Sequence, residues 1–277
     1  MMANLQILFL CGAAVLYTSA ALLYLYHLQR QAISSHPLLP LSLAAAGLLL
    51  QTALLGITAV QTAGTQLGGA NILMLASWTT MVIYFFFELI SRHRSYGAFL
   101  LPLILTSMII AWVLNAGGLN PNGMAIYASW PLLVVHIVAY FAAAAIFLFG
   151  GVSSIMYLYQ ERLLKAKRKD ALEARMPGLS FLKKVMRRSA PVGLLILAFG
   201  LTLGIMRAVS LDHAGWWMSL RIILSLVVFI MYCVITIQAY LIKSSAQTIA
   251  ILHVLGSFLV LILLVFSAFL PMLGTLS

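Results

Sequence analysis

Charged residues are scarce in this chain. They make up 8% of its 277 residues, and only five of them are acidic, whereas soluble domains carry roughly 25% charged residues. Hydrophobic residues reach 64%, and the mean hydropathy is +1.09. Such a chain cannot cover a surface that faces water, so a soluble fold is excluded and an integral membrane protein is predicted.

Cysteines and carboxylates are too few for most catalytic or metal chemistry. Cys11 and Cys233 both fall within apolar runs and show neither CxxC nor metal-ligand spacing. We therefore expect buried structural cysteines, not a disulfide, a zinc site or a redox pair. Paired carboxylates, an activated nucleophile and a metal-spaced cluster are also lacking. These absences predict that the protein is not an enzyme.

Long apolar runs account for most of the chain. A transmembrane helix needs about 20 mainly apolar residues. Eight runs approach or exceed that length, at 5–26, 38–61, 71–91, 97–115, 128–158, 190–210, 219–241 and 247–270. The predicted fold class is all-α, a polytopic membrane helix bundle of about eight transmembrane helices that forms a single transmembrane domain over residues 1–277.

Basic residues gather in alternate connections between these runs. The connections 27–37, 92–96, 159–189 and 242–246 hold 14 of the 16 Lys and Arg residues, while the intervening connections 62–70, 116–127 and 211–218 hold none. By the positive-inside rule, the basic connections are cytoplasmic. Both termini are therefore expected outside, in a multi-pass protein of a bacterial cytoplasmic (inner) membrane.

The basic cytoplasmic loop at 159–189 has two interpretations. As a topology signal it anchors the chain to anionic headgroups of the lipid bilayer, because each Lys or Arg near such a leaflet contributes about 1 kcal/mol. As a docking site it would hold a cytoplasmic protein. Nothing in the loop resembles a nucleic-acid-binding module, so no nucleic-acid partner is expected.

Ionisable side chains within the predicted spans are costly and are therefore candidate functional residues. Glu88 stands one turn before Arg92, and an i,i+4 ion pair explains it without a function. Arg207 and Arg221 lie near the outer ends of their spans, against the charge pattern of the chain. Asp212 can neutralise only one guanidinium group, which leaves room for a ligand carboxylate or propionate. Snorkelling to outer headgroups is the alternative.

Two histidines share the outer side with aromatic residues. His136 follows Trp130 near the start of its span, and His213 lies in an outer connection beside Trp216 and Trp217. Imidazole is an axial ligand of haem iron, and aromatic rings with arginines nearby suit a flat macrocycle and its propionates. A hydrogen bond to a neighbouring helix is the alternative role for such a histidine.

The remaining histidines lie toward the cytoplasmic side. His27, His36 and His93 fall at predicted membrane boundaries, where a half-polar ring needs no ligand, so we expect structural roles. His253 lies one or two turns into the last span and cannot easily reach the outer cluster. It is expected to be a packing residue or part of a separate inner site.

Three segments carry motifs of a known family. They are the run from Leu75 through Glu88 to Pro102, the run from Trp130 through His136 to Arg162, and the Trp216-Trp217 pair leading to Leu226. In these segments the chain resembles the cytochrome c assembly superfamily, which includes the CcsA-like and HemX-type proteins. In the haem-handling members, the outer loop is rich in tryptophan, and histidines on both sides of this loop coordinate haem for export and attachment to apocytochrome c.

The resemblance implies an accessory role in haem handling or cytochrome c biogenesis. Met218 and Ser219 follow the tryptophan pair in place of the Trp-Asp-Pro continuation, which is similar to the shorter HemX-type branch. The resemblance places His136 at the outer haem ligand and implies cytochrome c assembly or haem-biosynthesis proteins as partners. The alternative function is transport of a small anionic or amphipathic solute by Arg207 and Arg221, although we find no inverted repeat that would favour it.

Overall fold

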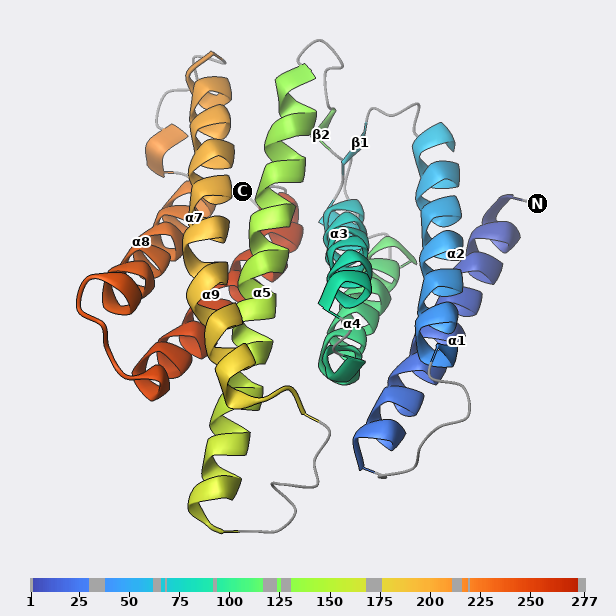
Figure 1. Cartoon of the computed structure of the whole chain (residues 1–277). Coiled ribbons are helices and arrows are strands. Elements are labelled where there is room, and N and C mark those ends of the chain that lie inside the picture. The colour runs from blue at the N-terminus through green and yellow to red at the C-terminus, as the bar shows by residue number, and fades with distance from the viewer. Residues whose placement is uncertain are drawn as a thin grey trace. The chain divides into compact units, whose positions relative to one another are not determined.

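The structure is a computed structural model, shown in Figure 1. It describes residues 2–29, 38–61, 66–67, 69–91, 94–116, 124–125, 131–167, 176–210, 216–218 and 220–273. The long helices are α1 (Met2–Gln29), α2 (Leu39–Gln61), α3 (Gly69–Ser91), α4 (Gly97–Ala116), α5 (Pro131–Lys165), α7 (Leu179–Ser210), α8 (Leu220–Tyr240) and α9 (Ala246–Leu273). The described residues also form two short 3-10 helices, η1 (Arg94–Tyr96) and η2 (Trp216–Met218).

All eight long helices in the described ranges are long and apolar enough to cross a membrane. The predicted helical fold class and number of spans are therefore confirmed. The structure adds one short antiparallel pairing, in which β1 (Gln66–Leu67) lies beside β2 (Met124–Ala125). These strands fall within two connections that carry no basic residues.

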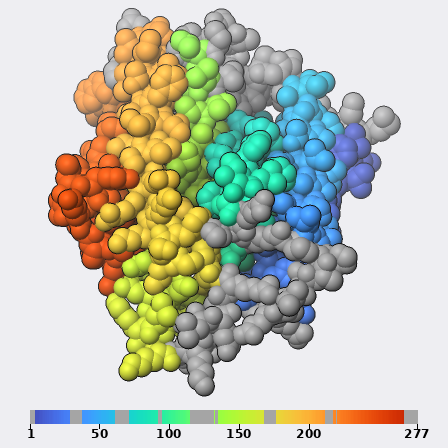
Figure 2. Space-filling view, in the orientation of Figure 1, coloured from blue at the N-terminus to red at the C-terminus, as the bar shows by residue number. Residues whose placement is uncertain are grey.

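Two helices extend beyond the predicted apolar runs into the basic segment. The run at 128–158 becomes α5, which has 35 residues and continues to Lys165, and the run at 190–210 becomes α7, which has 32 residues and begins at Leu179. Apolar runs end at the first charged residues, whereas Lys, Arg, Gln and Leu are good helix formers and let the helix continue. Much of the basic segment 159–189 is therefore helical. Figure 2 shows the C-terminal end of α5, in yellow-green, projecting past α7.

The described contacts gather into two compact units. The first unit contains α1 to α4 together with the strand pair, and the second contains α5, α7, α8 and α9 up to Ser267. Pro131 stands at the first position of α5, where its missing N–H costs nothing. Ser245 caps α9, because its hydroxyl accepts a hydrogen bond from the backbone N–H of Thr248 at 3.1 Å.

Polar side chains connect three helices inside the first unit. The Tyr17 hydroxyl on α1 donates to Oε1 of Gln51 on α2 at 2.8 Å, and Nε2 of Gln51 donates to the Ser77 hydroxyl on α3 at 2.8 Å. Gln51 is fully buried. Gly47 lets the ring of Tyr17 approach α2, because a Cβ there would lie 2.6 Å from Cε1 of that ring. Hydrogen bonds of this kind stabilise helix pairs within a membrane.

Glu88 is the buried carboxylate of the first unit. Only 2% of its surface is exposed, and the Tyr24 hydroxyl donates to its Oε1 at 2.7 Å. The Tyr84 hydroxyl donates to its Oε2. Gly97 makes room for this arrangement, since a Cβ at that position would lie 2.5 Å from the Tyr84 hydroxyl oxygen. The pairing with Arg92 predicted from the sequence falls on a residue outside the described ranges.

Small residues bring the helices of the second unit close together. Gly193 on α7 faces the ring of Phe147 on α5, and that ring stacks on Tyr232 of α8 at a centroid distance of 3.5 Å. Gly150 of α5 packs against His253 of α9 in the same way, since a Cβ at Gly150 would lie 2.8 Å from Nδ1 of the imidazole. Packing on small residues replaces the hydrophobic effect as the force that joins helices in lipid.

The expected burial of both cysteines is wrong. Cys11 on α1 is exposed and Cys233 on α8 is half-buried. The burial tendency of cysteine comes from proteins in water, whereas the outside of a membrane helix faces a solvent as apolar as the interior. A thiol is therefore accommodated on the outer surface of these helices as readily as in the core.

Candidate functional site

His136 is fixed against α7 by a single directed contact. Its Nδ1 lies 2.7 Å from the backbone carbonyl oxygen of Gly200. Because a carbonyl oxygen only accepts hydrogen bonds, Nδ1 carries a proton, and in the neutral tautomer with this proton Nε2 keeps its lone pair. Gly204, one turn further along α7, leaves space for the ring, since a Cβ there would lie 2.7 Å from Cε1. None of the described residues places a hydrogen-bond partner on Nε2.

A phenol lies next to this histidine, and a guanidinium group lies near that phenol. Tyr140 is one turn further along α5, with its ring centroid 6.4 Å from that of His136. The Tyr140 hydroxyl lies beside Ser225 and within electrostatic range of Arg221, both on α8. Arg221 is half-buried and donates through Nη2 to the carbonyl oxygen of Ser267 over a long 3.5 Å. No carboxylate among the described residues pairs with Arg221, so its charge is poorly compensated within the unit.

The structure describes some of the predicted site residues, and the others lie outside the described ranges. His136 and Arg221 both lie in the second unit and each has Tyr140 as a neighbour, and Arg207 lies half-buried on α7, three residues beyond Gly204. Trp217, in η2, is 61% exposed. Trp130 and His213, and the side chain of Trp216, fall outside the described part of the chain. The aromatic cluster therefore stays a prediction.

Sequence reasoning missed several contributors to this site. Tyr140 and Ser225 each stand four residues after a predicted site residue, His136 and Arg221 respectively. Residues four apart share a helix face, so this spacing could have identified both. Gly200 could not have been identified in this way, because its role depends on how α7 is aligned against α5.

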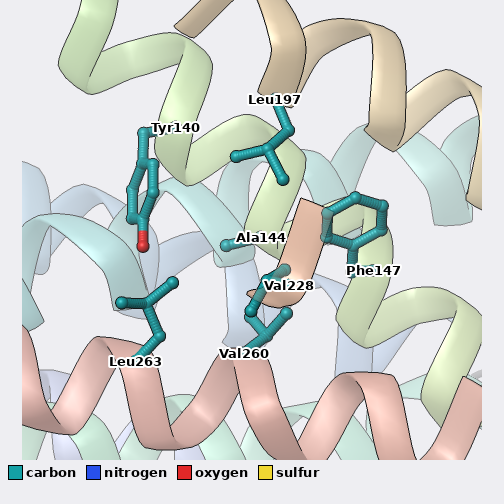
Figure 3. A pocket seen from close by; sticks show the side chains of 7 residues that line it. All are labelled: Tyr140, Ala144, Phe147, Leu197, Val228, Val260 and Leu263. Atoms are coloured by element: carbon teal, nitrogen blue, oxygen red, sulfur yellow. The ribbon is translucent and has the colours of Figure 1, made fainter. Parts of the chain in front are cut away.

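An apolar cavity lies below this site, inside the second unit (Figure 3). Its volume is about 10 Å³, and Tyr140 is the polar member of its lining, with the other side chains from Ala144, Phe147, Leu197, Val228, Val260 and Leu263. A volume of roughly 10 to 15 Å³ holds a single water molecule. A macrocycle therefore cannot enter this cavity.

His253 belongs to a different part of the same unit. It is fully buried, and its Nε2 donates to the carbonyl oxygen of Met186 at 2.8 Å. Its ring meets Tyr232 edge to face at a centroid distance of 5.6 Å. His136 packs against Gly200 and Gly204, whereas His253 packs against Gly150 and Met186, so the two histidines contact different turns of α5 and α7.

The described residues offer one imidazole that could bind haem iron, and they do not offer a cluster of side chains that could hold a metal ion. No group of three or more His, Cys, Asp or Glu residues lies close enough to hold an ion within the ranges that the structure describes. A single imidazole with its Nδ1–H bound to a carbonyl is instead the usual arrangement of a metal-ligating histidine, because that bond fixes the tautomer and the ring plane.

Comparison with known protein families finds a match. The family model described as cytochrome C assembly protein matches residues 66–273, which include α3 to α9. No curated protein and no solved structure matches the chain.

Proposed function

Because this chain belongs to the cytochrome c assembly protein family, we propose that it is a non-enzymatic accessory protein of haem handling in a bacterial cytoplasmic membrane. It contacts a tetrapyrrole at the outer face through Nε2 of His136. The observation that carries this proposal is the bond between Nδ1 of His136 and the Gly200 carbonyl, which presents Nε2 as a ready ligand.

The neighbouring residues suit the periphery of a haem. Iron supplies the axial bond to imidazole, and the two propionates supply negative charge. Arg221 lacks a paired carboxylate among the described residues, and it meets a propionate through charge-assisted hydrogen bonds. The macrocycle is covered by Arg207 or by the predicted aromatic residues Trp130, Trp216 and Trp217. His213 is the candidate for a second axial ligand.

Retention of haem at this site is weak. One imidazole on the outside of a helical unit leaves most of a macrocycle uncovered, and the cavity of about 10 Å³ adds no enclosed volume. Such a site suits transient contact and passage to a partner protein of cytochrome c assembly or haem biosynthesis. The small apolar cavity beside Tyr140 offers no route for a solute, so it gives the alternative of transport no support.

The visible spectrum of the purified protein tests the proposal. We expect added haemin to give a Soret band in the wild-type protein and in His27→Ala, which serves as a matched control because His27 lies half-exposed at the end of α1. The same titration of His136→Ala should give no band beyond that of haemin in detergent alone. An unchanged Soret band in His136→Ala would remove His136 from the site.

A further inference from the structure

The basic residues of α7, of α8 and of the turn after α8 lie at two depths in the membrane. Arg187 precedes Arg207 by 20 positions along α7, which corresponds to roughly 30 Å at about 1.5 Å per residue. That span equals the thickness of the hydrocarbon core, roughly 30 Å. Lys243 follows Arg221 by a similar length of chain, just beyond the end of α8. Arg187 and Lys243 therefore lie at one headgroup level, and Arg207 and Arg221 at the other.

Pro191 brings Arg187 and the α8–α9 turn together. A proline inside a helix has no N–H, so the carbonyl four residues earlier loses its helical partner. In α7 that carbonyl belongs to Arg187, and it accepts a hydrogen bond from the Tyr240 hydroxyl at 3.0 Å. Tyr240 ends α8, and Lys243 stands three residues later with a left-handed φ of 57°. The turn that carries Lys243 is thus attached beside the basic turn of α7.

The side chain of Arg187 has unused hydrogen-bonding capacity. Its Nε is buried and has no partner in the part of the chain that the structure describes. Lys184, one turn earlier on α7, and Lys243 are both exposed. The sequence contains no acidic residue between 176 and 210 or between 220 and 273, so neither helix α7 nor helices α8 and α9 supply a counter-charge. The buried Nε–H of Arg187 thus has no acceptor on these helices, and an anion at the headgroup level would satisfy it.

Apolar residues border this cluster of charge on the membrane side. Leu241 and Ile242, between Tyr240 and Lys243, are 76% and 59% exposed. A free phosphate ion would gain nothing from these side chains, whereas a lipid places its phosphate on the cations and its acyl chains along the apolar surface. The arginine fork matches two phosphate oxygens, and lysines add point charges.

We propose that Arg187, Lys184 and Lys243 form a binding site for the phosphate of an anionic membrane phospholipid. The site is independent of the haem-handling proposal, because it uses none of the residues around His136. It lies where α7 is held to the α8–α9 turn by the bond from Tyr240 to the Arg187 carbonyl. A bound headgroup therefore adds a second connection between these two elements.

Thermal unfolding of the full-length protein in a neutral detergent tests the site. Phosphatidylglycerol should raise the unfolding midpoint of the wild-type protein by several degrees, because a ligand that binds only the folded state stabilises it. Phosphatidylcholine and inorganic phosphate should leave the midpoint unchanged. The double variant Arg187→Gln, Lys243→Gln should lose the response to phosphatidylglycerol, and it keeps the bond from Tyr240, which uses only the backbone of residue 187.

A control variant that loses the same charge elsewhere in the chain distinguishes a specific lipid site from general electrostatic attraction to anionic lipid. Arg162 and Lys165 lie exposed near the end of α5, and the double variant Arg162→Gln, Lys165→Gln should respond to phosphatidylglycerol as the wild type does. If the first double variant does not fold, Arg187→Lys replaces it, with an expected response at least threefold weaker than that of the wild type at equal lipid concentration. Equal responses of the altered and control proteins, an equal shift with phosphatidylcholine, or a full shift with inorganic phosphate would each overturn the proposal.

Discussion

The Tyr24 hydroxyl donates a hydrogen bond of 2.7 Å to the Glu88 carboxylate, across 64 positions of the sequence. The bond joins α1 to α3 within the first unit, and it is one of two that phenols make to this carboxylate. A carboxylate taken out of water needs such donors, because the desolvation of a charge is otherwise uncompensated. Glu88 is therefore a structural connection between helices that uses charge-assisted hydrogen bonds.

Replacing Tyr24 with Phe tests this connection. The change keeps the ring and removes one donor from a buried carboxylate, and hydrogen bonds to charged groups contribute about 2 kcal/mol. We expect a loss of stability of that order, measured as a lower unfolding midpoint in detergent. Tyr159→Phe removes an exposed hydroxyl, since Tyr159 is 52% exposed, and should change little. Equal midpoints for the two variants would show that the Tyr24 hydroxyl does not support Glu88.

Gly204→Ala should remove haem contact without touching the histidine itself. A Cβ at residue 204 would lie 2.7 Å from Cε1 of His136, so the ring has to turn away from Gly200. The Soret band with added haemin should then fall nearly as far as in His136→Ala. Gly56→Ala is the control, because a Cβ at Gly56 meets nothing within 4 Å. A full Soret band in Gly204→Ala would mean that the position of the ring against α7 is unimportant for binding.

Arg221→Gln tests the propionate partner. Loss of a charge-assisted hydrogen bond of about 1.5 to 3 kcal/mol corresponds to an affinity for haemin that is lower by about tenfold to a hundredfold. Titration of haemin followed by absorbance measures this change. Arg162→Gln, which removes an equal charge at the end of α5, should keep the wild-type affinity. If both variants bind haemin equally, Arg221 is a snorkelling residue and has no ligand.

The orientation of the chain in the membrane rests on charge alone. With 14 of 16 basic residues in alternate connections, we expect the basic end of α5 to be cytoplasmic. A cysteine introduced at Lys165, in a variant without Cys11 and Cys233, should react with an impermeant maleimide only after the membrane is opened. A reporter fused after Ser277 should be active outside. Labelling of residue 165 in intact cells would reverse the orientation and every assignment of inner and outer sides.

The sequence predicted the positions of the helices well, but it predicted poorly where they end and which side chains bond to one another. Apolar runs located all eight long helices because composition alone decides whether a segment can lie in lipid. The ends of α5 and α7 were missed because helix formation continues through basic residues that a hydropathy scan excludes. For Glu88, the local i,i+4 rule suggested Arg92, whereas the described donors come from Tyr24 and Tyr84.

Two residues of the candidate site could be picked out from composition, as the helices could. His136 and Arg221 are rare polar residues in apolar runs, and such residues stand out in any sequence of this composition. The carbonyl of Gly200 is invisible to that reasoning, because every residue has a carbonyl and only the alignment of two helices selects one. The outer aromatic cluster and the single-domain organisation stay predictions.

The side chains around the small cavity of the second unit conduct protons poorly. Ala144, Leu197, Val228, Val260 and Leu263 neither donate nor accept a proton, so none of them can pass one along. One elementary charge that crosses a membrane dissipates about 2.3 kcal/mol per 100 mV. At this point of the second unit, the lining therefore opposes such a leak.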